Sequence, residues 1–210
     1  MRAPVVLLIT LCGLLAGGVT PARAASFTIT LDTSALVGAG SFALDFQLVD
    51  GDGAANTTVV LRDFTFGAGG PTGSPTLVGG ASGSLATGLT LQDTMFFNGA
   101  AQGFTPGATL AFLLEVSGSS DPARPDFFTM ALLDSNGFEV PTLGSAEELL
   151  SLALVGGAAP ESFATDPNRT SLDVPAPTVT TVPEPATALL LLTGALLVVH
   201  ERRRDPRARR

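Results

Sequence analysis

Lysine, histidine, cysteine, tryptophan and tyrosine are all absent between Ala25 and Val182. Without cysteine this region forms no disulfide bond, and without histidine it lacks the usual base of serine and cysteine hydrolases. Zinc sites built from histidine or cysteine, and Schiff bases on lysine, are excluded for the same reason. Tryptophan and tyrosine are also the aromatic side chains on which sugar rings usually stack, so phenylalanine alone has to replace them here. These absences favour a domain without catalytic activity.

Positive charge is scarce in the same region, where sixteen acidic residues and three arginines give a net charge of −13. The whole chain has a net charge of −8, because most of its arginines lie in the terminal segments. So acidic a surface repels nucleic acid and anionic lipid. We therefore expect no nucleic-acid partner, whereas divalent cations and neutral polymers fit the charge.

The first 24 residues have the pattern of a secretory signal peptide. Arg2 supplies the positive start, an apolar run extends from Val5 to Leu15, and Ala22 and Ala24 give the small residues that signal peptidase requires. We expect cleavage before Ala25. The alternative is an uncleaved membrane anchor, but the apolar run is shorter than the roughly 20 residues of a membrane span.

The other end of the sequence combines a short motif, an apolar stretch and a basic cluster. Val182-Pro183-Glu184-Pro185 precedes the apolar residues 186–199, which predict a transmembrane helix. At about 1.5 Å per residue this helix is somewhat short for a hydrocarbon core of roughly 30 Å. Arg202, Arg203 and Arg204 follow it and favour the cytoplasm, so the region before the helix faces outward.

This order of elements resembles the PEP-CTERM sorting signal of exopolysaccharide-producing Gram-negative bacteria. The resemblance implies that an exosortase, a membrane peptidase, recognises Pro183-Glu184-Pro185 in an inner-membrane precursor. It also implies delivery to the cell surface or extracellular matrix and an association with exopolysaccharide. The alternative is an ordinary C-terminal membrane anchor after a proline-rich segment. The segments 31–34 and 42–51, the glycine-rich loop with residues 71–75, and the segment 127–136 resemble an ectodomain type that recurs among PEP-CTERM proteins and has no assigned activity.

Alternating apolar and polar residues predict an antiparallel all-β domain, a β-sandwich or jelly-roll-like fold. The clearest alternation places Phe42, Leu44, Phe46 and Leu48 on one face of a strand. Strands are expected over residues 26–31, 41–48, 58–66, 84–91, 109–116, 127–133 and, more weakly, 171–174. Residues 145–154 fit a helix or a strand equally well.

The expected organisation has five parts. They are a signal peptide over residues 1–24, a β-sandwich over 25–165, a proline- and threonine-rich linker over 166–182, a sorting signal with its transmembrane helix over 183–204, and a basic tail over 205–210.

The best candidate ligands are Asp50, Asp52 and Asn56, hard oxygen donors in a glycine-rich loop that suit calcium. A solvated turn would use the same residue types, and it remains the alternative. A second acidic group comprises Asp121, Asp126, Asp134 and Asn136. Beside the non-catalytic matrix protein, two further functions stay open: a calcium-dependent carbohydrate-binding module, and a glycosidase that uses only carboxylates. The carboxylates in or beside expected strands are Asp45, Asp63, Asp93 and Glu115.

Overall fold

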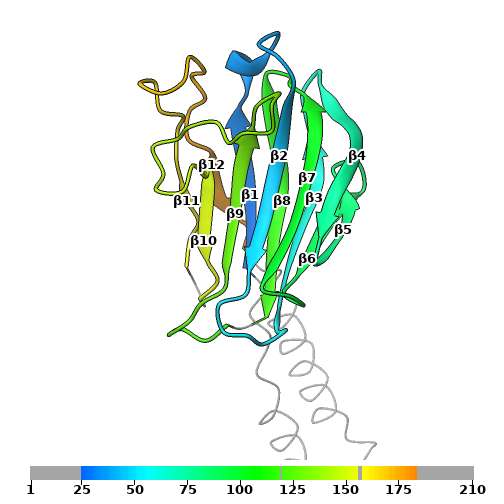
Figure 1. Cartoon of the computed structure of the whole chain (residues 1–210), viewed down its shortest axis with the longest axis vertical. Helices are drawn as coiled ribbons and strands as arrows, with labels where there is room; N and C mark the ends of the chain where they lie inside the picture. Colours follow the sequence, from blue (N-terminus) through cyan, green and yellow to red (C-terminus); the bar gives the residue numbers. More distant parts are fainter. Residues whose placement is uncertain (1–24, 119, 156–157, 184–210) are drawn as a thin grey trace, which may run out of the picture.

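The computed structural model describes residues 25–118, 120–155 and 158–183 as two antiparallel sheets of six strands each (Figure 1). The first sheet has the order β12-β1-β8-β3-β6-β5, and the second has the order β11-β10-β9-β2-β7-β4. The strands of the first sheet are β1 (Ala25–Asp32), β3 (Thr57–Thr65), β5 (Gly80–Ser84), β6 (Gly88–Gln92), β8 (Thr109–Gly118) and β12 (Thr178–Thr181). Those of the second are β2 (Phe42–Val49), β4 (Gly70–Val78), β7 (Phe97–Thr105), β9 (Phe127–Leu133), β10 (Leu150–Ala153) and β11 (Glu161–Ser162). The prediction of an all-β antiparallel fold is confirmed.

The core lies between the two sheets, where the alternating residues of β2 meet those of β1, β3 and β8. Phe46 is fully buried, with its ring centroid 5.9 Å from that of Phe112 and 6.4 Å from that of Phe128. Phe112 belongs to the first sheet and Phe128 to the second, so these rings join the two layers. Removing such large apolar side chains from water is the main favourable contribution to folding.

Two segments differ from the sequence expectation because of their glycine content. Residues 84–91 form parts of two strands, β5 and β6, instead of one, since the chain turns between Gly83 (φ +91°) and Gly88 (φ +93°). The glycine- and proline-rich residues 70–78, which none of the expected strands covers, form the edge strand β4. A shift in register between Thr72 and Thr76 accommodates Pro75. Proline has no backbone N–H to donate, and an edge strand tolerates this because it has no second neighbouring strand to pair with.

The proposed linker over residues 166–182 is wrong, because this segment belongs to the domain. Val174 is fully buried, and its backbone N–H donates to Thr165 Oγ1 at 2.9 Å. β12 then pairs with β1, placing Thr181 opposite Phe27. The extended conformation that proline and threonine favour is used here for sheet pairing, so the domain continues to Val182 instead of ending at residue 165. Residues 171–174 are not a strand, and residues 150–153 of the ambiguous segment form β10 instead of a helix.

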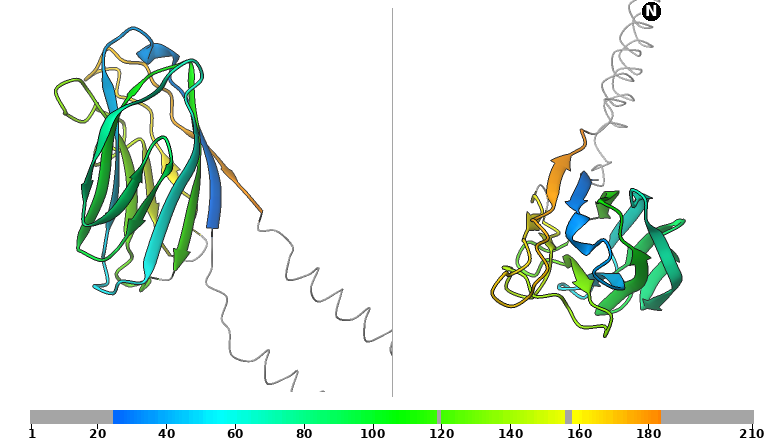
Figure 2. Two further views of the ribbon diagram at one scale, coloured as in Figure 1. Left: turned by 90° about the vertical axis from the view of Figure 1, so that its right-hand side faces the viewer. Right: turned by 90° about the horizontal axis from the view of Figure 1, so that it is seen from above.

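Both ends of the described chain lie at the same end of the sandwich (Figures 1 and 2). β12 is antiparallel to β1, and the Val182 backbone N–H donates to the Ser26 carbonyl oxygen at 2.8 Å. The loops of residues 50–56, 93–96 and 120–126 lie at this end too, because β2, β6 and β8 all run toward it. We call it the stem end, and the opposite end the far end.

Within the described residues, no helix combines the length and the apolar character that crossing a membrane requires. The expected signal peptide with Ala22 and Ala24, the transmembrane helix, Glu184 and Pro185, and the cluster of Arg202 to Arg204 lie outside the described residues. The predictions for these segments stay predictions.

Candidate metal centre

Two loops at the stem end bring three carboxylates together. Asp50 and Asp52 lie in the loop between β2 and β3, and Asp126 immediately precedes β9. One carboxylate oxygen from each of the three lies within 4.8 Å of the others. Asp126 is fully buried, whereas Asp50 and Asp52 are half-buried. Because like charges at such distances raise one another's energy, the cluster favours a bound cation.

Gly51 allows the two loops to approach one another. A Cβ atom at this position would lie only 2.1 Å from the Pro125 carbonyl oxygen, so any side chain would push the loops apart. The Gly51 backbone N–H donates to Asp126 Oδ1 at 2.9 Å. On the other side, Gly53 has φ +79° and its N–H donates to Asp50 Oδ1 at 2.6 Å. The glycines therefore fix the carboxylates of both loops in place.

Asp52 is held in its ionised form by the backbone around it. The Asp121 N–H donates to Asp52 Oδ2 at 2.9 Å, and the Ala54 N–H donates to Asp52 Oδ1 at 2.8 Å. The hydrogen bond from Asp121 above all, and that from Ala54, lower the pKa of Asp52. The side chain of Asn56, a ligand in our sequence interpretation, donates its Nδ2 to Asp52 Oδ2 at 3.2 Å. The structure therefore places Asn56 as a support of Asp52.

A second buried carboxylate, Asp93, lies on the other side of Thr57. Thr57 Oγ1 donates to Asp126 Oδ2 at 2.7 Å, and the Thr57 backbone N–H donates to Asp93 Oδ2 at 2.8 Å. The Asn56 N–H also donates to Asp93 Oδ2, at 2.9 Å. Burial above all raises the pKa of Asp93, and the charge of Asp126 adds to the rise, against the lowering effect of these hydrogen bonds. Thr57 thus links the buried candidate ligand Asp126 to a second buried acid, Asp93.

The donor set suits calcium better than any softer metal. Calcium takes six to eight oxygen ligands, among them carboxylates and backbone carbonyls, together with water. Asp50, Asp52 and Asp126 offer three carboxylates, and the half-buried positions of the first two leave that side of the cluster open to solvent. Arg124 lies 3.9 Å from Asp121, and its positive charge makes a small contribution to the lowered pKa of Asp52. The sequence identified Asp50 and Asp52, whereas Asp126 had been assigned to a different acidic group.

Replacing Asp93 with asparagine is expected to raise the melting temperature at pH 7. Asparagine keeps an oxygen that can accept the two backbone hydrogen bonds, and it removes a buried charge near Asp126. The folded-state pKa of Asp93 lies above its ordinary value of 3.8, so the wild type loses stability relative to D93N as the pH rises through the raised pKa. The difference in melting temperature should therefore shrink toward about pH 4.

Asp63→Asn provides the control for this measurement, since Asp63 is exposed and pairs with Arg62 at 2.5 Å. We expect D63N to have little effect at either pH, because exposed ion pairs contribute little to stability. If D93N were less stable than the wild type by the same amount at pH 4 and pH 7, the buried charge of Asp93 would not be what destabilises the folded protein.

The remaining carboxylates of the sequence interpretation have structural partners. Glu115 forms a bond of 2.8 Å with Arg62 Nε, and Asp45 accepts from Gln47 Nε2 at 2.6 Å. Asp134, assigned together with Asp126 in the sequence, lies at the far end, where its Oδ1 caps a turn by accepting from the Asn136 N–H at 2.8 Å. The glycosidase hypothesis gains no support from these contacts.

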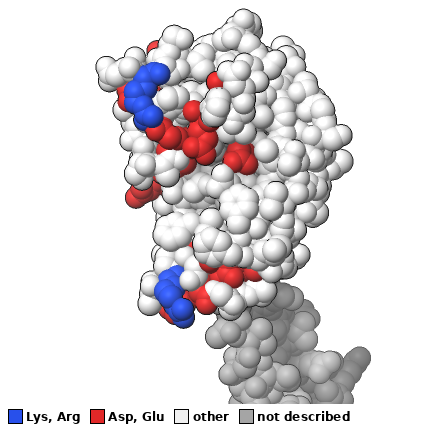
Figure 3. Space-filling view, in the orientation of Figure 1, with Lys and Arg blue, Asp and Glu red and all other residues white. Residues whose placement is uncertain are grey.

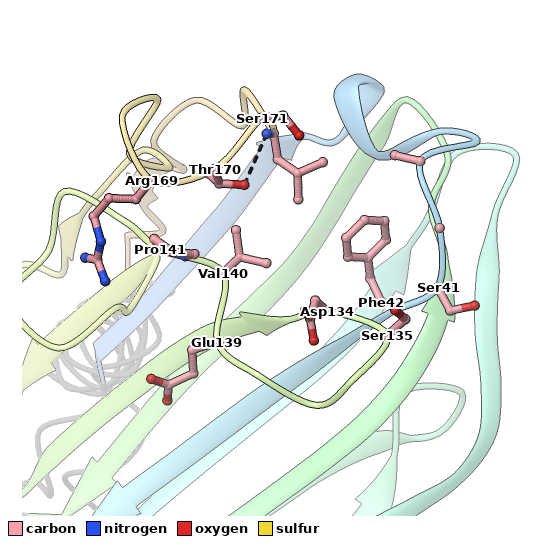
Figure 4. Close-up of a pocket in the computed structure, with 13 residues that line it drawn as sticks. Ser41, Phe42, Asp134, Ser135, Glu139, Val140, Pro141, Arg169, Thr170 and Ser171 are labelled. Atoms are coloured by element: carbon pink, nitrogen blue, oxygen red, sulfur yellow. Dashed lines mark hydrogen bonds between the residues drawn. The ribbon is translucent and has the colours of Figure 1, made fainter.

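A cavity of about 350 Å³ lies at the far end, between the β1–β2 loop and residues 134–141 and 169–172 (Figure 4). Phe42, Asp134, Glu139 and Arg169 are among its lining residues. Burial above all raises the pKa of Glu139, and the charge of Asp45 adds to the rise. Arg169 pairs with Glu147, so its charge is already matched. The sequence interpretation did not identify this cavity, because its walls come from three segments far apart in the chain.

No family model, curated protein or solved structure matches this chain.

Proposed function

We propose that the chain is an exported, non-catalytic surface or extracellular-matrix protein that an exosortase-type peptidase processes at Pro183-Glu184-Pro185 and that associates with exopolysaccharide. The observation that supports this most is the position of the motif at the boundary of the domain. β12 ends at Thr181, the Val182 backbone is hydrogen-bonded to that of Ser26, and Pro183 is exposed. Cleavage after this point leaves every described strand intact. The inner-membrane precursor is thereby converted into a surface protein without loss of its fold.

Replacing Glu184 with alanine tests this proposal. We expect mass spectrometry of the wild-type extracellular protein to find no peptide that contains Leu196 or Arg202. The E184A protein should accumulate as a membrane-bound precursor, because its apolar stretch and arginines are unchanged. Glu161→Ala is the matched control, an exposed glutamate in β11, and it should be processed normally. Extracellular protein that still carries Arg202 would contradict the proposal.

A calcium-dependent carbohydrate-binding module is the second candidate function. It is favoured by the close approach of the Asp126 carboxylate to those of Asp50 and Asp52. The strand order β1-β8-β3-β6 beside β2-β7-β4 supports the jelly-roll form of the sandwich, an architecture that lectins share. Fold alone does not assign function, so this candidate depends on the metal. Its test is the response of the melting temperature to calcium.

A further inference from the structure

Large apolar side chains project into solvent at the stem end. Phe96 is 75 % exposed and Met95 is 60 % exposed, both in the loop between β6 and β7. Val78, Phe97 and Phe127 are also exposed, and each stands at the stem end of its strand. Side chains of this kind cost free energy in water unless another surface covers them.

The loop that carries Met95 and Phe96 is held firmly by Asn98, which is fully buried. Asn98 Oδ1 accepts from the Met95 N–H at 3.2 Å and from the Gly80 N–H at 2.8 Å. Its Nδ2 donates to the Met95 carbonyl oxygen at 2.6 Å. The Asp50 N–H donates to the Phe96 carbonyl oxygen at 3.0 Å. With its backbone fixed in this way, the loop keeps Phe96 exposed.

The outer face of the second sheet continues this apolar surface. Val49 lies opposite Phe97 on one neighbouring strand and opposite Phe127 on the other. Directly paired residues share a face of the sheet, so the three side chains form a row beside the loop. In Figure 3 one acidic group extends over the upper half of the visible face and a second lies near the stem end, while a broad uncharged area occupies the right-hand side of the view.

The sequence after Val182 ties this same end to the expected membrane span. Only three residues separate Val182, which is bonded to Ser26, from the apolar stretch that begins at Ala186. Val182 and Ala186 are therefore four residue steps apart, which reach about 14 Å at most. If the apolar stretch enters a bilayer, the stem end is held within that distance of the bilayer surface.

We propose that, in the membrane-inserted precursor, the stem end rests on the lipid surface with Phe96 and Met95 in the headgroup region. This inference depends on the proposed membrane anchoring and adds an orientation to it. Aromatic side chains are favoured at this depth of a bilayer. The docked domain holds Pro183 at the membrane surface, where a membrane peptidase reaches it.

Charge favours a neutral lipid surface over a second copy of the chain as the occupant. Two stem ends facing each other would bring together two sets of Asp50, Asp52 and Asp126, in domains of net charge −13. Zwitterionic lipid carries no such charge. The same acids predict that anionic lipid weakens the contact.

A tryptophan placed at the stem end reports this contact, because the chain has no tryptophan of its own. The full-length F96W protein is reconstituted into phosphatidylcholine vesicles with brominated acyl chains, and its fluorescence is compared with that in unbrominated vesicles. The matched control is F138W, since Phe138 is 72 % exposed at the far end. Both positions are on the surface, and equal melting temperatures would verify that both variants fold.

We expect emission at shorter wavelength and roughly twofold stronger bromolipid quenching for F96W than for F138W, given that interfacial side chains reach about 5–10 Å into the bilayer. Equal quenching in protein that floats with the vesicles would overturn the docking and leave the anchoring intact. Failure of the full chain to float would overturn both. Emission at short wavelength without bromolipid quenching would identify a protein surface, such as a second copy, as the occupant and would also overturn the docking.

Discussion

Millimolar calcium is expected to raise the melting temperature of the protein by several degrees. Asp50, Asp52 and Asp126 place three carboxylate oxygens within 4.8 Å of one another, and Asp126 is shielded from water. A divalent cation bound among them offsets their repulsion in the folded state only, because the unfolded chain does not hold these residues together. The stabilisation is on the order of 1–4 kcal/mol when calcium is well above its dissociation constant.

Sodium at matched ionic strength separates binding from screening. Screening weakens the repulsion among all acidic residues of the domain, so sodium alone should give only a small shift. Calorimetry, or a thermal melt followed by circular dichroism, measures the shift in melting temperature in each salt. An equal shift in the two salts would mean that the Asp50–Asn56 loop is a solvated turn without a metal.

Asp50→Asn is the variant that tests the site most directly. It keeps an oxygen to accept the Gly53 N–H and removes one ligand charge, so the fold should persist while the calcium-specific shift is lost. Asp134→Asn is its matched control, because Asp134 has a similar turn-capping role at the far end. D134N should keep the full calcium response. A full response in D50N would rule out Asp50 as a ligand.

The sequence predicted β2, whose inward positions are uniformly apolar, and it missed β7, whose inward positions are partly polar. In β2 the four inward residues are Phe or Leu, which makes the alternation plain. In β7 the inward positions include Asn98 and Gln102, which hide the same alternation. Gln102 is satisfied by accepting from the Leu85 N–H at 2.8 Å and donating to the Gly73 carbonyl oxygen at 3.0 Å. Such partners are distant in sequence, and no local pattern indicates them.

The candidate site was predicted in part for a similar reason. Asp50 and Asp52 are two residues apart, so their spacing is visible in the sequence. Asp126 joins them only because Gly51 packs against Pro125, a contact between residues 74 positions apart. A glycine that precedes an aspartate in a loop is common in ordinary turns. The sequence therefore indicates the local half of the cluster and leaves out the buried carboxylate that completes it.

Removing residues 167–182 from the domain should lower its melting temperature by about 10 °C or more. A linker could be removed without effect, whereas the structure has Val174 in the core and β12 paired with β1. Burial of a valine side chain contributes about 1.5–3 kcal/mol. Without Val174, Thr165 also loses the backbone N–H that donates to its hydroxyl oxygen. A loss of several kcal/mol is a large part of the roughly 5–15 kcal/mol that stabilises an ordinary domain.

Two matched truncations locate the effect within the segment. A chain that ends at Pro183 keeps both features and serves as the reference, and one that ends at Pro177 keeps Val174 but lacks β12. Ending at Pro177 removes the four backbone pairs between β12 and β1 and leaves β1 as an exposed edge, so it should cost less than ending at Asp166. Thermal melts followed by circular dichroism rank the three chains. Equal melting temperatures would mean that residues 167–182 contribute nothing to the fold, as a linker would.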